Sequence, residues 1–418
     1  HRPSVSFDIS QKEIEITELA MPAVPTDLKS IISNSPRDEM INSLSKVPFQ
    51  ELTERNKLIL IILQSHYYES NTYDLSQFNK QVYKNIAEIV YKSSLDESYK
   101  PSIEFINELK NDKYLFNLLS EKFNINKDKV INYKLAKLMY LKLITIRTIP
   151  LISILIGSIL VLKAIWKTFN SKVINWAKYQ PLDLNILDMI LLIAGGFVVL
   201  GEVFSPLISI TLVDLFSKNL SSEIVQSLKI FFGYLFMAIP PIFIIYRQIK
   251  FINKEFILKN DYFQFNFKPL NVSIIQGLKG WFMIIPFVLL TSLIMNQLVE
   301  NQAGSNPLLE IVLNNNNYLA FIILFITTTL VAPLFEELIF RGVLLPVLSR
   351  DFGKINGIII SSFVFALAHL SFTEFPPLFV LGIGLAATRL LSGRLFSSVI
   401  MHSLWNGLTF FNLFLLRT

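Results

Sequence analysis

Hydrophobic and polar residues follow two different patterns along this chain. From about residue 37 to residue 140, apolar residues recur every three or four positions, as in "SIEFINELKNDKYLFNLLSEKF". This period predicts amphipathic helices, so we expect residues 37–140 to form a soluble bundle of about five helices. Residues 1–36 are more polar and include "MPAVP", and we expect an extended lead-in there.

From residue 141 onward, long apolar runs replace this period. Eight of them come near the ~20 residues that a helix needs to cross a bilayer. They lie at 148–166, 186–214, 228–246, 274–296, 318–341, 355–370, 376–391 and 396–416. The predicted fold class is all-α: a polytopic membrane protein of about eight transmembrane helices with an N-terminal soluble helical domain. We expect residues 141–269 to hold additional transmembrane helices and residues 270–418 to form the core that carries the chemistry.

The composition agrees with a membrane protein and excludes several kinds of site. Of the 418 residues, 52% are hydrophobic and 17% are charged, which is too apolar for an ordinary soluble protein. The chain has no cysteine, which excludes disulfides, thiolate metal sites and a cysteine nucleophile. Residues 141–418 hold 20 Lys or Arg against 13 Asp or Glu. A basic surplus around apolar runs is typical of inside-facing membrane loops, so no nucleic-acid partner is expected.

The basic residues alternate between the loops that join the apolar runs. The loops after the third, fifth and seventh runs carry Lys and Arg, among them Arg247, Arg350 and Arg394, whereas the loops after the fourth and sixth carry none. We therefore expect the basic loops to face the cytoplasm or its equivalent, and residues 1–140 to face a periplasm or lumen. The expected membrane is a bacterial inner membrane or a thylakoid-type membrane. Because the chain starts with His1 and not with Met, we also expect an upstream segment, such as a signal peptide or anchor helix.

Three polar clusters interrupt the apolar runs of the last hundred residues. They occur in "FEELIFRGVLLP", "FVFALAHL" and "MHSLWNGL", and they contain Glu336, Glu337 and Arg341, then His369, then His402 and Asn406. Each acid at the centre of a span costs about 2.5 kcal/mol or more on a translocon-based scale, so such groups usually persist for a function.

The spacing of these residues predicts which of them share a helix face. Glu337 and Arg341 are four residues apart and can form an ion pair, which leaves Glu336 pointing about 100° away. His402 and Asn406 have the same spacing and can point at one bound group. Counted from the inside-facing loops, the three clusters lie at overlapping depths, as a buried polar cavity requires. A polar residue that stands alone in a span is more often a contact between helices, and we interpret Glu202 in this way.

The motifs EExxxR, FxxxH and HxxxN, in this order, resemble those of the CPBP intramembrane protease family, also called Abi or CAAX-protease-like. This family includes the type II CAAX prenyl endopeptidases. The flanking "LVAPLFEELIFRGVLLPVL" and "TRLLSGRLFSSVIMHSLWN" are also similar, the second with its Gly-containing turn before the last helix. The resemblance covers about residues 270–416. With a long exported helical domain ahead of this core, the chain is most similar to cyanobacterial members.

The resemblance implies a glutamate protease that acts inside the membrane. Glu336 would be the general base that activates a water, and His369 would help to hold that water. His402 and Asn406 would donate hydrogen bonds to the oxyanion of the tetrahedral intermediate. This mechanism requires no cofactor.

Under the same resemblance, Glu337 and Arg341 would be a structural ion pair. Metal use stays open at this point. Glu336, His369 and His402 could form a three-ligand zinc site with water in the fourth position, although the chain has no HExxH motif.

Three functions from different classes are compatible with these residues. The favoured one is an intramembrane endopeptidase that hydrolyses a peptide bond. The second is a non-proteolytic membrane scaffold or regulatory protein that binds a membrane partner. A transporter is disfavoured, because its polar groups would more often line both halves of the bundle. The expected partners are a membrane-embedded or membrane-delivered peptide or protein substrate, the lipid bilayer, and a protein partner of residues 1–140. The sequence does not name the substrate.

Overall fold

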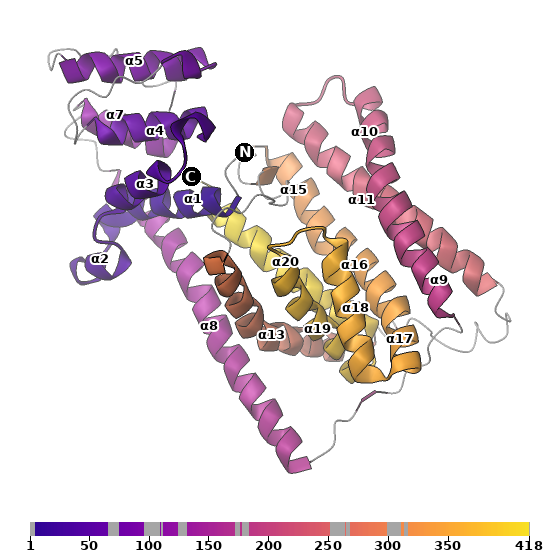
Figure 1. Ribbon diagram of the computed structural model, residues 1–418. Coiled ribbons are helices and arrows are strands. Elements are labelled where there is room, and N and C mark those ends of the chain that lie inside the picture. The colour runs from indigo at the N-terminus through magenta and orange to yellow at the C-terminus, as the bar shows by residue number, and fades with distance from the viewer. Residues whose placement is uncertain are drawn as a thin grey trace. The chain divides into compact units, whose positions relative to one another are not determined.

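The computed structural model describes most of the chain, and the statements below concern the residues that it describes. These are residues 5–65, 75–95, 109, 112–123, 132–171, 176–177, 184–250, 264, 268–298, 311–312 and 317–417. The regular elements in these ranges are all helical (Figure 1). The chain divides into two compact units, which are His1–Ile149 with Asn301–Leu309 and Leu413–Thr418, and Pro150–Glu300 with Glu310–Asn412.

The first unit contains a small helical domain. Its helices are α1 (Val5–Ala20), α2 (Thr26–Ile32), α3 (Pro36–Ser45), α4 (Glu54–Gln64), α5 (Gln81–Leu95) and α7 (Lys113–Lys122), with short turns η1 (Met21–Ala23), η2 (Phe49–Glu51) and η3 (Leu75–Gln77). Helix α4 is its centre, because every residue from Leu58 to Leu63 is buried. A helix that is apolar on all sides must be enclosed by its neighbours. The boundaries of the helices are set locally by side chains such as Thr53 and Asp112, which accept hydrogen bonds from the first turns of α4 and α7.

The extended conformation predicted for residues 1–36 is wrong for the described part of that segment. Residues Val5–Ala20 form α1, and Ile16, Leu19 and Ala20 of this helix are buried. These three positions share one helix face, so packing against the domain core stabilises the helix. The polar composition of the segment did not predict it.

The charged residues of α1 also have partners within the domain. Arg55 of α4 donates to Glu15 of α1 at 2.5 and 3.0 Å and to Asp112, the N-cap of α7, at 2.6 and 3.0 Å. Paired, forked hydrogen bonds of this kind are among the strongest that a guanidinium makes. One arginine therefore ties three helices together.

The second unit holds the helices that could cross a membrane. Six helical stretches in the described part of the chain are long and apolar enough, namely Tyr133–Asn170, Ile186–Phe216, Ser222–Gln248, Leu270–Met295, Tyr318–Phe352 and Phe375–Ser392. The predicted fold class, an all-α polytopic membrane protein, is confirmed. The first stretch is α8 (Tyr133–Ser171), which enters the second unit at Pro150.

Two of the eight predicted spans differ from the other six. Helix α18 (Lys354–Ala368) is apolar but has only 15 residues. Helix α20 (Leu395–Leu415) is long, but it is not among the six apolar stretches. It buries Ser397, Ser398 and His402. Such side chains lower the mean hydropathy of a helix that contacts protein instead of lipid.

Two helical stretches contain three π-helical segments, and each segment ends two residues before a proline. These segments are η4 (Leu191–Phe204), η5 (Thr327–Val331) and η6 (Leu338–Leu344), followed by Pro206, Pro333 and Pro346. Proline has no N–H group, and its ring clashes with the carbonyl four residues earlier. A wider turn relieves that clash without breaking the helix. The chain thus continues through α15 (Tyr318–Ile326), α16 (Ala332–Glu337) and α17 (Leu345–Phe352) as one long stretch.

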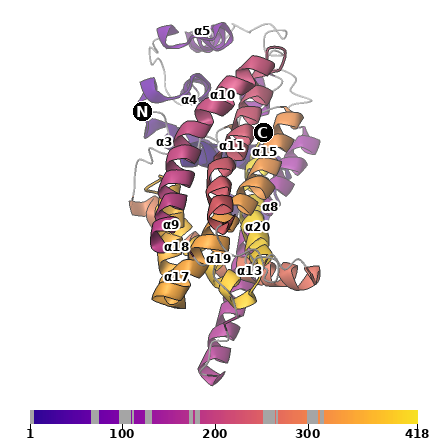
Figure 2. The same ribbon diagram turned by 90° about the vertical axis from the view of Figure 1, so that its right-hand side faces the viewer.

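The remaining helices pack around this stretch. They are α9 (Ile186–Ile190), α10 (Ser205–Phe216), α11 (Ser222–Lys250), α13 (Leu270–Leu298) and α19 (Phe375–Ser392). Figures 1 and 2 show α10 and α11 side by side, and α18 contacts both α17 and α19. Helix α19 ends at Gly393, whose φ of +68° suits glycine and turns the chain into α20.

Candidate active site

Two consecutive carboxylates form the centre of the site. Glu336 and Glu337 end the six-residue helix α16, between the π-helical segments η5 and η6. Both are buried, Glu337 completely and Glu336 with 7% of its surface exposed. π-Helical turns are frequent at functional sites, where they change the direction of the side chains that follow.

Arg341 of η6 holds the second carboxylate. Its Nη1 donates to Glu337 Oε1 at 2.8 Å, and its Nη2 donates to the carbonyl of Gly382 at 3.4 Å. The guanidinium carbon lies 4.1 Å from the ring centroid of Phe365. All of these contacts are buried, so the charge of Arg341 is offset by a carboxylate, a carbonyl dipole and an aromatic face.

His402 lies between the two carboxylates. Its Nδ1 is 3.0 Å from Glu337 Oε1, and its Nε2 is 3.8 Å from Glu336 Oε2. Because the carboxylate that accepts from Arg341 has no hydrogen to give, the Nδ1–H of His402 donates to it. This bond fixes the orientation of the ring and turns Nε2 toward Glu336. The sequence spacing did not reveal this contact, because it joins α16 to α20.

His369 lies at the edge of the site. It follows the last residue of α18, is exposed, and has its Nδ1 2.8 Å from the carbonyl of Phe365. Its ring packs edge-on against the ring of Phe365, with 4.8 Å between the ring centroids. The ring of His402 packs edge-on against the same phenyl ring, with 5.8 Å between the centroids. Phe365 therefore connects the two histidines, which approach it from different helices.

Two further features surround His369. Leu370, the next residue, has a φ of +52°, a left-handed conformation that is strained for leucine. Glu374, in the turn before α19, lies within electrostatic range of His369. Burial raises the pKa of the Glu374 carboxyl, and His369 opposes this increase.

Asn406 contacts the backbone of η5. Its Nδ2 donates to the carbonyl of Thr328 at 2.9 Å. That carbonyl lacks a helical partner, because the N–H of Ala332 bonds to Thr327 and Pro333 has no N–H. Asn406 thus satisfies a carbonyl that the π-helical turn leaves free. The proline in "VAPLFEE" was the sequence signal for this contact.

Two residues from outside the motifs lie near Glu336. The negative charge of Glu336 acts on Glu202 of η4, and both of these carboxyl groups act on Tyr234 of α11. Sequence reasoning assigned Glu202 to packing between helices.

The packing of η4 explains why Glu202 reaches this level. Three contacts show that the stretch α9–η4–α10 runs antiparallel to the stretch α15–α17. The carbonyl of Leu184 accepts from Arg350, the ring of Phe197 stacks on that of Phe335 at 5.9 Å, and Ser221 accepts from Asn317. Glu202 is five residues beyond Phe197, about one turn of a π-helix, which brings it to the level of α16.

Only some of the predicted site residues contact one another. Glu336, Glu337, Arg341 and His402 form one buried cluster. His369 and Asn406 contact its margins through Phe365 and Thr328.

The residues of the site do not form a metal centre in this arrangement. In the described part of the chain, no three His, Asp or Glu side chains are grouped so that they could hold a metal ion. The Nδ1 atoms of both histidines are engaged, by Glu337 and by the carbonyl of Phe365. Zinc at Glu336, His369 and His402 stays a prediction.

Two segments of the chain match known families. Residues 318–408 match the family described as type II CAAX prenyl endopeptidase Rce1-like. Residues 6–141 match a domain of unknown function, DUF8675. No curated protein and no solved structure matches the chain. The resemblance read from the motifs is confirmed for the segment that contains all of them, and an additional N-terminal domain precedes it.

Proposed function

We propose that this chain, whose residues 318–408 belong to the type II CAAX prenyl endopeptidase Rce1-like family, is an intramembrane endopeptidase that hydrolyses a peptide bond with a water activated by Glu336. The family match supports a CAAX-protease type of function for this segment. The observation that supports the mechanism is that the adjacent carboxylates Glu336 and Glu337 have different partners. Glu337 pairs with Arg341 and with His402. Glu336 does not form an ion pair with Arg341 and lies 3.8 Å from His402 Nε2.

In this mechanism Glu336 takes a proton from the attacking water as the new C–O bond forms. A carboxylate within hydrogen-bond reach of the water can act as this general base. Glu337 and Arg341 keep the helix in register and hold His402. The Nε2 side of His402, 3.8 Å from Glu336, is then next to the reacting atoms.

The oxyanion and the water have further proposed partners. For this role the ring of His402 carries a hydrogen on Nε2 as well as the one on Nδ1 that Glu337 accepts. The Nε2–H and Asn406 then stabilise the negative charge of the tetrahedral intermediate, and His369 helps to hold the water. Asn406 has two N–H groups on Nδ2, so one can donate to Thr328 while the other faces the substrate. We include Glu202 and Tyr234 as neighbours of the base, because their electrostatic interaction with Glu336 is supported by the antiparallel packing of η4.

The substrate we propose is a membrane-embedded or membrane-delivered peptide or protein. It reaches the site from the side of the basic loops or laterally from the lipid. In this proposal the basic loops face the cytoplasm and the N-terminal helical domain faces the lumen or periplasm, where it binds a protein partner. The alternation of Lys and Arg between loops supports this orientation.

Cells that carry the wild-type protein, Glu336→Gln or the control Glu121→Gln provide the test. New peptide termini in the membrane proteome are measured in each strain by mass spectrometry. We expect a set of cleavage products in the wild type and in Glu121→Gln that is lost in Glu336→Gln, by roughly 10²–10⁴-fold as for other general bases. A membrane scaffold, the alternative function, would keep its phenotype in Glu336→Gln. Identical termini in all three strains would therefore contradict the protease.

A further inference from the structure

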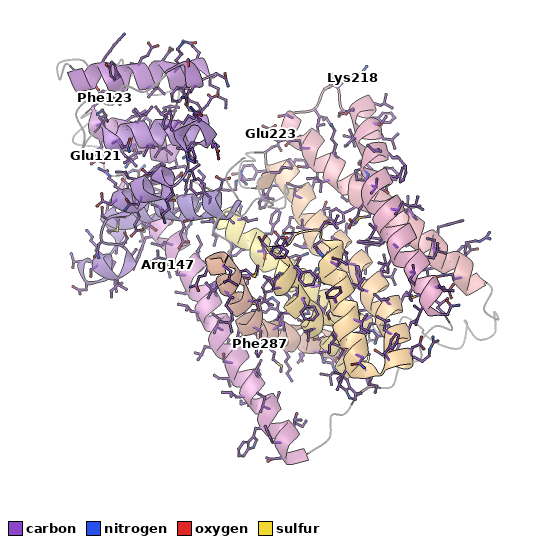
Figure 3. The ribbon with its side chains drawn as sticks, viewed as in Figure 1. Glu121, Phe123, Arg147, Lys218, Glu223 and Phe287 are labelled. Atoms are coloured by element: carbon purple, nitrogen blue, oxygen red, sulfur yellow. The ribbon has the colours of Figure 1, made fainter. Side chains whose placement is uncertain are left out.

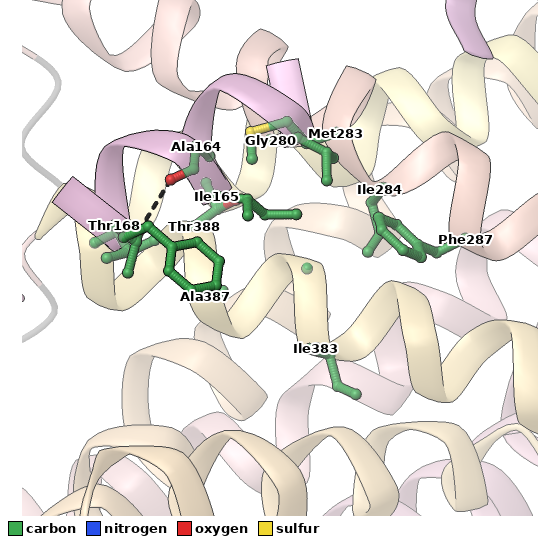
Figure 4. Close-up of a pocket in the computed structure, with 14 residues that line it drawn as sticks. Ala164, Ile165, Thr168, Gly280, Met283, Ile284, Phe287, Ile383, Ala387 and Thr388 are labelled. Carbon is green, nitrogen blue, oxygen red and sulfur yellow. Dashed lines mark hydrogen bonds between the residues drawn. The ribbon is translucent and has the colours of Figure 1, made fainter. Parts of the chain in front are cut away.

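A cavity of about 680 Å³ lies between α8, α13 and α19 (Figure 4). Some of the residues in 161–169 of α8, 280–287 of α13 and 383–391 of α19 line it, and none of the candidate active-site residues does. Eight residues of helix correspond to about 12 Å, so the cavity is elongated along α8 and α19. Its volume falls in the range of small-molecule sites, about 300–1,000 Å³.

The lining of the cavity offers no free polar group. Thr168 and Thr388 are its only residues with a polar side chain. Thr168 Oγ1 donates to the carbonyl of Ala164 at 3.0 Å, as Figure 4 shows, and Thr388 Oγ1 lies 3.2 Å from the sulfur of Met401. A peptide in this cavity would have no partners for its backbone N–H and C=O groups, which is costly away from water. The chemistry of the lining therefore selects a hydrocarbon.

The cavity is closed at one end and open along its side. At Gly157, a Cβ atom would lie 2.1 Å from the carbonyl oxygen of Phe282, so α8 and α13 touch there and only glycine fits. One turn later, from Val161 onward, the cavity begins. Its side chains Ile165 and Phe169 are 47% and 76% exposed. Because α8 is long and apolar enough to cross a membrane, lipid can reach this opening.

The charges near the cavity have one sign. The helical residues 150–171, 270–298 and 375–392 contain no Asp or Glu, and their basic residues are Lys163, Lys167, Lys279 and the buried Arg389. Lys279 is exposed and directly precedes Gly280, which lines the cavity. Trp166, 72% exposed on α8, is a residue type that is enriched at the level of the headgroups. Basic residues at this level attract anionic headgroups.

We propose that this cavity binds one acyl chain of an anionic phospholipid, with the headgroup phosphate at Lys279. The chain fills the apolar groove between α8, α13 and α19, and the bound lipid joins α8, which contacts α13 closely at Gly157, to the segment that carries the active site. The site does not depend on the proposed protease activity.

Binding of defined lipids to the delipidated full chain tests the proposal. Native mass spectrometry in detergent counts the molecules of phosphatidylglycerol or phosphatidylcholine that are retained. Ile165→Trp fills the cavity, and Leu162→Trp is the matched control, because Leu162 is exposed on the same helix but does not line the cavity. We expect one phosphatidylglycerol on the wild type and on Leu162→Trp. Its affinity should fall by about tenfold in Ile165→Trp, as the loss of a few buried methylene contacts predicts.

The other arms separate the lipid sources. Lys279→Glu should weaken the binding of phosphatidylglycerol and leave the binding of phosphatidylcholine unchanged. Three results would overturn the proposal. The first is equal retention of phosphatidylglycerol by Ile165→Trp and Leu162→Trp, and the second is equal retention of phosphatidylglycerol and phosphatidylcholine by the wild type. The third is retention of the isoprenoid alcohol geranylgeraniol but of no phospholipid. A phosphatidylglycerol with a photoreactive acyl chain gives a readout on the unmodified protein. Cross-links should concentrate in residues 161–169, 280–287 and 383–391, and an even spread over the exposed helix faces would refute the assignment.

Discussion

Two arginines, one in each unit, keep their charge in different ways. Arg55 in the N-terminal domain is 20% exposed and shares four hydrogen bonds with two carboxylates, Glu15 and Asp112. Arg341 in the membrane unit is fully buried and has one carboxylate, Glu337, together with a carbonyl and an aromatic ring. A second carboxylate is adjacent in both cases, but only Arg55 uses it.

This difference shows how a membrane site can separate structure from chemistry. In the N-terminal domain Arg55 can bond to two carboxylates, because Lys12 also pairs with Glu15 and balances the second negative charge. In the membrane unit, Glu337 bonds to both Arg341 and His402, whereas Glu336 lies 3.8 Å from His402 Nε2 and forms no ion pair with Arg341. The predictions below test this contrast, beginning with the largest effect.

Arg341→Met should be the most destabilising of these changes. It removes the partner of a fully buried carboxylate and leaves that charge uncompensated, at a cost of roughly 3–5 kcal/mol. The measurement is unfolding of the detergent-solubilised protein in denaturant. Lys163→Met, an exposed lysine of α8, is the control and should change stability by no more than about 0.5 kcal/mol. Equal losses in both variants would mean that the ion pair has no special role.

The sequence predicted the parts of this arrangement that depend on one helix. Glu337 and Arg341 are four residues apart, and the ion pair of the structure joins those two residues. The apolar runs predicted the membrane-spanning helices for the same reason, since length and composition are local properties. The helical period likewise indicated the N-terminal bundle.

Contacts between helices could not be predicted in this way. The bond from His402 to Glu337 and the approach of Glu202 to Glu336 depend on how α20 and η4 pack against α16. The π-helical turns change the direction of side chains beyond them, so an ideal helical wheel fails at these positions. A proline in an apolar run signals such a turn but does not tell which carbonyl it leaves free. The exposure of His369 follows from the end of α18, and a short apolar run sets that end only within a few residues.

Asn406→Ala tests an uncharged contact in the same unit. The carbonyl of Thr328 would lose its hydrogen bond, which costs about 1–3 kcal/mol for a buried group. Thr409→Ala, on the exposed side of α20, is the control and should be nearly neutral. If Asn406 also donates to the oxyanion, cleavage per folded molecule should fall by about 10²–10³-fold. A variant with normal stability and normal turnover would contradict both roles.

The cluster of charges around Arg55 should respond to acid. Burial disfavours the charge of Glu15, but Arg55 and Lys12 more than offset this effect and lower its pKa, and Arg55 lowers that of Asp112 in the same way. A lowered pKa in the folded state stabilises the domain above the unfolded pKa, near pH ~4 for these residue types, and this stability is lost as the pH falls through the folded value. The slope reaches about 1.4 kcal/mol per pH unit for each additional proton that the unfolded state binds.

Hydrogen exchange of α4 in the full chain measures this loss, with the intrinsic rates corrected for pH. We expect reduced protection below pH ~4 in the wild type. Glu15→Gln should flatten the pH dependence and lower protection at neutral pH. Unchanged pH dependence in that variant would show that Glu15 does not supply the effect.

The smallest effect is expected at the exposed end of the N-terminal domain. Glu121 of α7, labelled in Figure 3, pairs with Arg37 Nη2 at 2.5 Å but is 45% exposed. An exposed ion pair contributes no more than about 1 kcal/mol, so Glu121→Gln should barely change the protection of α3 from hydrogen exchange. Glu18→Gln is the comparison, because Glu18 is 9% exposed and accepts from both Arg37 and Tyr114. Its loss leaves a buried hydroxyl and a guanidinium with weaker partners and should cost more than the loss of Glu121. If Glu121→Gln were the more damaging change, burial would not be the property that decides the strength of these pairs, and the contrast between Arg55 and Arg341 would need another cause.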